Sequence, residues 1–267
     1  MITFNATSVI VKSKALLCTI FILTSSSVFS QTDESANKNR FVSGTLTATN
    51  NGISLLPTFT LGKPAVMFDF AMGGKKLTFE PYFRFALEGK PWNFIFWCRY
   101  KILKTEKFQL GVGAHPALGF KTVTQTINGI STNVITSQRY LGSEISPNYF
   151  IRRNISIGLY YLHSYGLEET STRSTDFITV NVNFSNLRLT ERYFLKFHPQ
   201  LYYLKMDQRD GYYATAAITL ARKNSPLSIQ SILNKAIDST IITKSDFVWN
   251  VSLLYSFRKN FTPASVL

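Results

Sequence analysis

The sequence contains three histidines that could take part in chemistry: His115, His163 and His198. One of them, His163, is followed directly by Ser164, and Glu168 and Glu169 come a few residues later. A serine nucleophile, a histidine base and a carboxylate are the groups that hydrolytic acyl transfer uses. Adjacent residues on a strand point to opposite faces, so His163 and Ser164 cannot share a hydrogen bond in a regular strand. We therefore assign no catalytic residue and keep hydrolysis as an alternative. No metal-ligand spacing or phosphate-binding loop predicts a cofactor.

The segments that must position these residues alternate apolar and polar side chains. The pattern is clearest over 77–87, 178–185 and 247–258, and period-2 alternation is typical of half-buried strands. We count twelve such segments, at residues 52–62, 64–73, 76–88, 92–103, 107–125, 134–151, 154–166, 175–188, 191–206, 211–223, 227–236 and 246–258. Their lengths are close to the roughly 9–11 residues that a tilted strand needs to cross a bilayer. Five prolines fall inside them, where we expect bulges or strand breaks: Pro57, Pro81, Pro116, Pro147 and Pro199.

The N-terminal residues have the features of a secretory signal peptide. Lys12 and Lys14 precede an apolar run at 15–24, and small residues follow up to Ser30. We expect cleavage near Ser30–Gln31 and an exported chain with one cysteine, Cys98, and therefore no internal disulfide. After Ser30 no apolar stretch is long enough for a membrane helix, and a membrane protein without helices must be a closed barrel.

Charge excludes one class of partner. The formal net charge of +14 falls to +12 when Lys12 and Lys14 leave with the signal peptide. No run of Lys and Arg is longer than two residues, and an exported protein rarely meets nucleic acid, so we expect no nucleic-acid partner. The charge instead indicates an anionic membrane surface outside the protein or a basic lumen inside it.

The chain resembles the outer-membrane β-barrels of Gram-negative bacteria over about residues 52–258. The signal peptide, the strand pattern and the final strand ending at Tyr255-Ser256-Phe257 carry this resemblance. The stretches Leu61-Gly62-Lys63-Pro64 and Gly89-Lys90-Pro91-Trp92 look most like small uncharacterised barrels of the Bacteroidota. The resemblance implies a closed antiparallel up-and-down transmembrane barrel of about twelve strands, with short turns on the periplasmic side and longer loops outside.

The predicted domain boundaries follow from this pattern. A signal peptide covers 1–30, a polar lead-in covers 31–51, the barrel covers 52–258 and a C-terminal tail covers 259–267. Residues 41–49 are also β-like. We treat them as a partial strand in the lead-in, because counting them and omitting 227–236 would place the longer loops on the periplasmic side.

Alternation also predicts what lies inside the barrel. A short loop between 76–88 and 92–103 would place Leu87 opposite Trp92, which puts Glu80 opposite Arg99. Ionisable groups at membrane depth must be paired and face protein or water, so we expect this face to line the lumen. The predicted lumen charge cluster comprises Glu80, Arg84, Arg99, Lys101, His115, Glu144, Lys196 and His198.

These features predict an outer-membrane barrel that is either a narrow channel for small solutes, including anionic ones, or a structural barrel whose lumen is filled by side chains. The alternatives are an outer-membrane lipid hydrolase or deacylase, with His163-Ser164 near the external end of its strand, and a secreted soluble lipocalin-like binder. The expected partners are outer-membrane lipid, the barrel-assembly machinery and a small solute. The sequence makes no prediction about oligomeric state.

Overall fold

The computed structural model describes residues 40–54, 59–127, 130–243 and 245–261. All of them belong to the second of two compact units, Asn39–Leu267, so the predicted signal peptide and its cleavage site lie outside the described residues. The strands are β1 Arg40–Thr49, β2 Ala65–Gly73, β3 Leu77–Ala86, β4 Pro91–Lys104, β5 Phe108–Ile127, β6 Ile130–Arg152, β7 Ile155–Gly166, β8 Ser174–Arg188, β9 Tyr193–Met206, β10 Arg209–Arg222, β11 Leu227–Ser239, β12 Phe247–Trp249 and β13 Ser252–Phe261.

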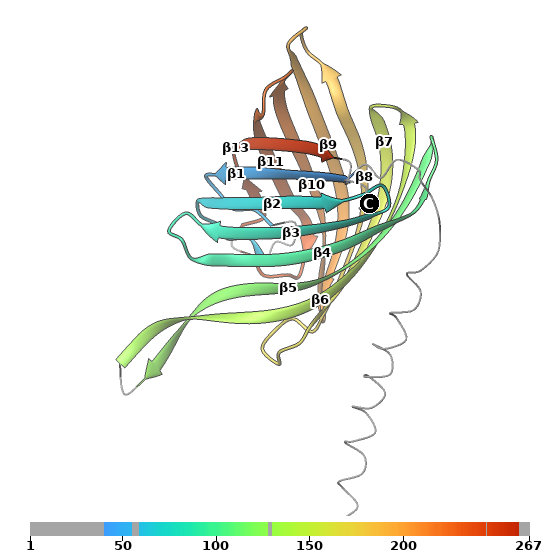
Figure 1. The fold of residues 1–267 in the computed structure, drawn as a ribbon. Coiled ribbons are helices and arrows are strands. Elements are labelled where there is room, and N and C mark those ends of the chain that lie inside the picture. The colour runs from blue at the N-terminus through green and yellow to red at the C-terminus, as the bar shows by residue number, and fades with distance from the viewer. Residues whose placement is uncertain (1–39, 55–58, 128–129, 244, 262–267) are drawn as a thin grey trace, which may run out of the picture. The chain divides into compact units, whose positions relative to one another are not determined.

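The strands form one closed antiparallel sheet (Figure 1). Each strand from β1 to β11 pairs with its neighbours in sequence, and β13 pairs with both β11 and β1 to close the ring. β12 and β13 pair with β11 in a single register, so they are two parts of one final strand, interrupted at Asn250–Val251. The predicted closed barrel of twelve antiparallel strands is therefore confirmed.

The identity of the first strand differs from the prediction. β1 makes ten register pairs with β13 and nine with β2, so 41–49 is a full barrel strand and no partial lead-in. The described parts of 52–62 contain no strand. The chain there folds back, with the N–H of Leu61 donating to the carbonyl of Gly52 over 2.9 Å. The alternation over 52–62 wrongly predicts a strand, because Ile53 is buried in this loop as an apolar residue of a strand would be.

The in-strand prolines cause neither bulges nor strand breaks at the four described positions. Pro81, Pro116, Pro147 and Pro199 each lie in a continuous strand that stays paired in register with one neighbour. On the other side the pairing skips two residues and then resumes in the same register. Proline has no N–H to donate, so each of these prolines interrupts the strand pairing on one edge of its strand only. Pro57 lies outside the described residues.

The two ends of the barrel differ in their connections. The loop end carries the longer connections at 50–64, 167–173 and 240–246, and the β5–β6 hairpin extends beyond its neighbours there (Figure 1). The turn end carries short turns at 74–76, 105–107, 153–154, 189–192 and 223–226. Arg40 and Phe261, the first and last residues of the described strands, also lie at this end. The sequence predicts this difference between the two ends, although the loop end also has short connections at 87–90 and 207–208.

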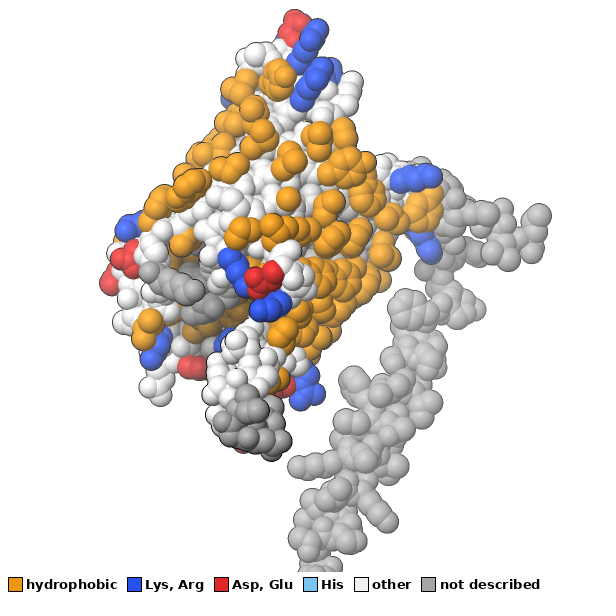
Figure 2. Space-filling view, turned by 90° about the vertical axis from the view of Figure 1, so that its left-hand side faces the viewer, with side chains coloured by type: hydrophobic (Ala, Val, Ile, Leu, Met, Phe, Trp, Pro, Cys, Tyr) orange, Lys and Arg blue, Asp and Glu red, His pale blue; other side chains and the backbone are white. Residues whose placement is uncertain are grey.

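The outer surface is apolar. On the face shown in Figure 2, hydrophobic side chains cover broad areas, and charged side chains are confined to small groups. Val180 and Leu253 are about half exposed, whereas Thr179 and Ser252 beside them in sequence are buried inside. Outward-facing phenylalanines also pack on one another, as Phe83 does with Phe94 and Phe96. Among the described residues, no helix is long and apolar enough to cross a membrane.

Candidate functional site: two walls of the lumen

One wall of the lumen, formed by β3 to β6, is held by a buried ion network. The guanidinium of Arg99 donates to both carboxylate oxygens of Glu144, over 2.6 and 3.1 Å, and also pairs with Glu80. Tyr82 joins the network by accepting from Arg99 and donating to Glu80, each over 2.9 Å. Paired acceptors of this kind make strong, directional hydrogen bonds with a guanidinium. Each of the three guanidinium nitrogens of Arg99 thus donates to a protein oxygen, and we call these four residues the Arg99 network.

Glycine makes room for these long side chains. Gly113 lies directly opposite both Arg99 on β4 and Glu144 on β6. A Cβ at Gly113 would lie 2.8 Å from Oε1 of Glu144 and 3.0 Å from Cγ of Arg99, closer than packed atoms normally come. Arg99 and Glu144 therefore both depend on the glycine at position 113 for their space.

The register of the β3–β4 hairpin differs from the prediction by two residues. Glu80 lies opposite Trp97, and the residue opposite Arg99 is Thr78. The cause is the position of the turn: the loop is 87–90, one residue earlier than the pairing of Leu87 with Trp92 requires, and moving a loop by one residue changes each pair by two. A shift of two residues keeps every side chain on its predicted face. For that reason Arg99 still reaches Glu80 diagonally and the predicted ion pair forms.

Arg84 lies on the same wall but is held more loosely. Its Nε is 3.7 Å from Oδ1 of Asp69, a distance for an ion pair but too long for a hydrogen bond. The guanidinium also lies over the rings of Tyr82 and Trp92, at 5.7 and 5.8 Å from their centres. Arg84 therefore retains hydrogen-bonding capacity that Arg99 has used up.

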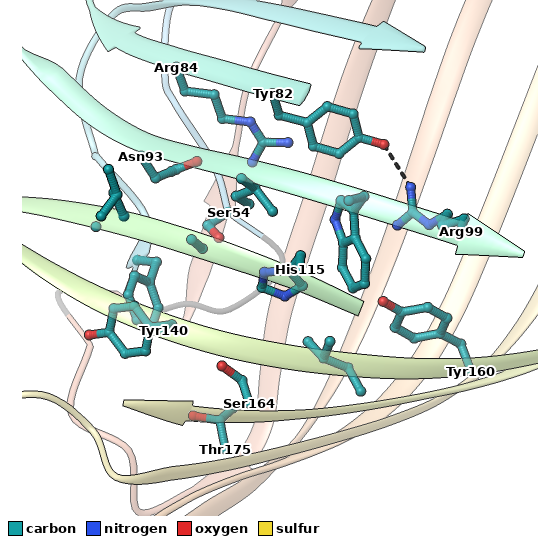
Figure 3. Close-up of a pocket in the computed structure, with 17 residues that line it drawn as sticks. Ser54, Tyr82, Arg84, Asn93, Arg99, His115, Tyr140, Tyr160, Ser164 and Thr175 are labelled. Carbon is teal, nitrogen blue, oxygen red and sulfur yellow. Dashed lines mark hydrogen bonds between the residues drawn. The ribbon is translucent and has the colours of Figure 1, made fainter. Parts of the chain in front are cut away.

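A cavity of about 250 Å³ opens in front of this wall toward the loop end. Figure 3 shows Arg84 and Asn93 on one side of it, Arg99 and Tyr160 on the other, and His115 between them. The inward-folded loop contributes Phe59, whose carbonyl accepts from the indole N–H of Trp92 over 2.7 Å.

The opposite wall, formed by β7 to β10, carries an apolar cluster at the loop end, whereas Lys196 and His198 lie toward the turn end of its lumen face. Phe177 and Leu204 are completely buried there, and the rings of Tyr202 and Tyr213 stack at 4.8 Å. Together with Leu162 they belong to one hydrophobic cluster inside the barrel. These side chains fill the loop end of the lumen on this side.

A second cavity, of about 290 Å³, lies against β1, β2 and β3. Ser43, Thr45 and Asp69 line it, and Tyr82 lines both this cavity and the first. Tyr82 and the ion pairs beside it therefore border both cavities.

The predicted charge cluster is only partly assembled. The structure brings together Glu80, Arg99 and Glu144, with Arg84 and His115 around the same cavity. Lys101, Lys196 and His198 fall on the lumen face by alternation but do not line that cavity. The ammonium of Lys196 instead lies 5.9 Å from the ring of Phe194. Alternation identifies the face of a residue, whereas its height along the barrel depends on register.

The outer face near the loop end holds a polar group that the sequence did not reveal. Nδ1 of His163 is 2.9 Å from Oδ1 of Asp176, which also accepts from Tyr161 over 2.7 Å. Ser143 on β6 lies directly opposite His163 on β7, which lies opposite Asp176 on β8. Ser164, the serine next to His163 in sequence, is buried on the lumen side. A serine, a histidine and an aspartate thus line up across three strands, although 20 and 13 residues separate them in sequence.

Among the described residues, no group of three or more His, Cys, Asp or Glu side chains is placed to hold a metal ion.

Comparison with known proteins shows similarity of fold without similarity of sequence. No protein-family model and no curated protein matches the chain. The structure of the KdgM porin superposes with a TM-score of 0.51 at 11% identity, covering 80% of this chain and 99% of the porin. At the level of fold, the chain resembles an outer-membrane porin. The NanC porin (TM-score 0.46, 10% identity, 80% of this chain and 97% of that one) and an outer membrane channel from Pseudomonas putida F1 (0.45, 9%, 85% and 100%) also match.

Proposed function

We propose that this protein is an outer-membrane barrel that acts as a narrow channel for small solutes, anionic ones included. The observation that carries the proposal is the pair of lumen cavities that meet at Tyr82 inside a closed barrel. The apolar outer face supports a membrane location, because exposed hydrophobic areas of this extent would make a soluble lipocalin-like binder aggregate. Outer-membrane lipid and the barrel-assembly machinery are the partners this location requires. The porin fold and the predicted signal peptide, cleaved near Ser30–Gln31, agree with it.

Single-channel recording in planar bilayers tests the channel. We expect small current steps from the unmodified protein and larger steps from Tyr82→Ala, because Tyr82 borders both cavities. Tyr100→Ala is the matched control, since Tyr100 is on the same hairpin but faces outward. We also expect Glu80→Gln to shift ion selectivity toward anions. Absence of current from both the unmodified protein and Tyr82→Ala would leave a structural barrel with a filled lumen.

Location is tested separately. The protein should be recovered in outer-membrane fractions with heat-modifiable gel migration, and mass spectrometry should find its N-terminus near Gln31. Recovery as a soluble periplasmic monomer would contradict both the location and the channel.

A second candidate function, lipid ester hydrolysis on the outer face, is favoured by the alignment of Ser143, His163 and Asp176. His163 bonded through Nδ1 to Asp176 keeps Nε2 to accept the proton of Ser143 as Oγ attacks an ester carbonyl. A fluorophosphonate probe should then label the protein, Ser143→Ala should abolish the labelling, and Ser164→Ala should not affect it. Labelling that survives Ser143→Ala, or no labelling at all, would dismiss hydrolysis and leave His163 and Tyr161 as interfacial side chains.

A further inference from the structure

The turn end of the barrel carries a ring of basic side chains. Each of its five turns, taken with one flanking residue on either side, contains two Lys or Arg residues, and the paired ends of β1 and β13 supply two more. We call these twelve residues the basic collar: the Lys and Arg residues of 73–77, 104–108, 152–155, 188–193 and 222–227, together with Arg40 and Lys259. All twelve are exposed.

Acidic side chains do not balance this charge. The same segments contain two carboxylates, those of Glu106 and Glu191, so their net charge is +10. Among the described residues, the one ion pair that a collar residue makes joins Arg188 to Glu191 over 3.9 Å, between side chains that are 73% and 91% exposed. The loop-end connections, delimited in the same way, contain five Lys or Arg and five Asp or Glu. Like charges gathered at one end repel one another, and an anion from outside the chain would relieve that repulsion.

Outward-facing tyrosines place the collar at the level of lipid head groups. Tyr149 and Tyr193 are 50% and 43% exposed. Tyr193 lies directly opposite Arg222, and Tyr149 lies directly opposite Phe108, the residue that follows Lys107. Tyrosine is enriched where the apolar part of a membrane meets water, and barrels carry such aromatic belts at both interfaces. The basic side chains beside these tyrosines therefore lie where the phosphates of a bilayer lie.

The distribution of the collar favours a lipid over a protein partner. Two basic residues lie at each of six positions around the ring of strands. A protein that docks on the barrel covers one side of it and needs cations on that side alone. Lipids surround a barrel completely and meet every one of the six positions.

We propose that the basic collar binds acidic phospholipids of the leaflet at the turn end. The lipid phosphate lies at a pair of basic side chains, and the acyl chains lie against the apolar outer face. This inference rests on the outer-membrane location in the proposed function, in which short turns face the periplasm and the leaflet is the periplasmic one. It goes beyond the channel, because it assigns a lipid partner to one end of the barrel whether or not the lumen conducts.

Spin-labelled lipids test the preference in the purified protein reconstituted in phosphatidylcholine vesicles. Electron paramagnetic resonance distinguishes lipids held at the barrel surface from free ones, for phosphatidylglycerol and phosphatidylcholine labelled on the same chain. At low salt we expect phosphatidylglycerol to associate about 3-fold more strongly, because a preference of about 5-fold at the collar, or about 1 kcal/mol for one basic side chain, is averaged with none at the neutral loop end. The preference should decrease as salt is added. Equal association of the two lipids at low salt would overturn the proposal.

Cross-linking locates the bound lipid. A phosphatidylglycerol with a photoreactive group in its head region should label the collar segments more than the loop-end connections, as read by mass spectrometry of peptides. The double variant Lys75→Gln, Lys76→Gln should lose labelling at the turn 74–76 by about 5-fold or more, because both of its cations are gone. Labelling at the turn 189–192 should persist in the same sample and serves as the internal control.

A matched variant removes the same charge at the other end. Lys63 and Lys90 have side chains that are 42% and 52% exposed near the loop end. Lys63→Gln with Lys90→Gln should leave the labelling of the turn 74–76 unchanged, and heat-modifiable migration verifies that both double variants are folded. Equal loss of labelling in the two variants, or labelling mainly on the loop-end connections, would show that the collar is not the site.

Location and conductance separate this inference from the proposed function. Recovery as a soluble periplasmic protein would remove the location and this inference together. A protein of the outer-membrane fraction that holds phosphatidylglycerol and phosphatidylcholine equally would remove this inference alone. If the double variant of Lys75 and Lys76 alters anion selectivity in bilayers but not lipid labelling, the collar attracts solutes to the lumen and the lipid assignment is wrong.

Discussion

The two walls of the lumen bury their side chains by opposite means. On β3 to β6, long charged side chains are held by hydrogen bonds, and Gly113 gives Arg99 and Glu144 their space. On β7 to β10, Phe177 and Leu204 are buried by packing alone among other apolar side chains. The walls meet where Tyr160 on β7 donates to Glu144 on β6 over 2.7 Å.

This difference shows how one barrel can combine stability with a passage. A packed apolar wall needs no water and can close its side of the lumen completely. A charged wall leaves polar groups that a solute can satisfy in turn, which is why both cavities lie along it. In the channel that we propose, the route follows the charged wall, and the apolar cluster on β7 to β10 supplies the support against which that wall is held.

The largest expected effect comes from breaking the charged wall at its most buried member. Glu144 has a side chain only 3% exposed, and Glu144→Ala would leave Arg99 without its paired acceptor. Removing one partner of a buried ion pair typically costs about 3–5 kcal/mol. Denaturant unfolding in lipid vesicles, followed by tryptophan fluorescence, should show a loss of this size. Glu106→Ala, in an exposed turn, is the control; a loss no greater than its own would mean that water already solvates Arg99.

A smaller effect is expected on the apolar wall. Leu204→Ala removes a completely buried side chain and should cost about 3 kcal/mol through lost burial and the space left behind. Leu201→Ala, on the same strand but 61% exposed on the outer face, should cost much less in the same measurement. In bilayers, Leu204→Ala should also widen the lumen without changing ion selectivity, because no charge is altered. A change in selectivity would contradict the assignment of the route to the charged wall.

The sequence predicts which side chains face the lumen better than it predicts which of them meet there. Period-2 alternation identifies which residues face inward, because one buried face constrains every second side chain in a strand. It does not identify the partner across the lumen. The Ser143, His163 and Asp176 alignment and the separation of Lys196 from the Arg99 network both depend on strand register. The exact residues of each turn, such as 87–90 between β3 and β4, set that register, and the alternation does not specify them.

The first strand shows the same limit. Residues 40–49 and 52–62 have similar alternation, and only closure of the ring distinguishes them. β1 must pair on both edges, with β2 and β13, whereas the loop after it can bury Ile53 without a partner strand. The loop end and turn end were nevertheless predicted correctly, because exchanging one segment for the other leaves the direction of every later strand unchanged.

The smallest expected effect concerns the rim, where the loop after β7 is tied to the charged wall. Arg139 on β6 donates to Glu168 through Nε and through its backbone N–H, each over 2.6 Å. These hydrogen bonds lower the pKa of the Glu168 carboxyl below its ordinary value of 4.5. A lowered pKa means that the tie is complete above pH 4.5 and is lost as the pH falls through the lowered value. Both groups are exposed to solvent, so screening keeps the effect on stability small.

Spin-label mobility measures this tie directly. In a Cys98→Ser background, a label at Glu169→Cys should be immobile at neutral pH and become mobile on acidification below about pH 4.5, while unfolding of the barrel is unchanged. Glu168→Gln should make the label mobile at every pH, because the amide cannot pair with the guanidinium as a carboxylate does. If the acid transition persists in Glu168→Gln, another titrating group holds the loop.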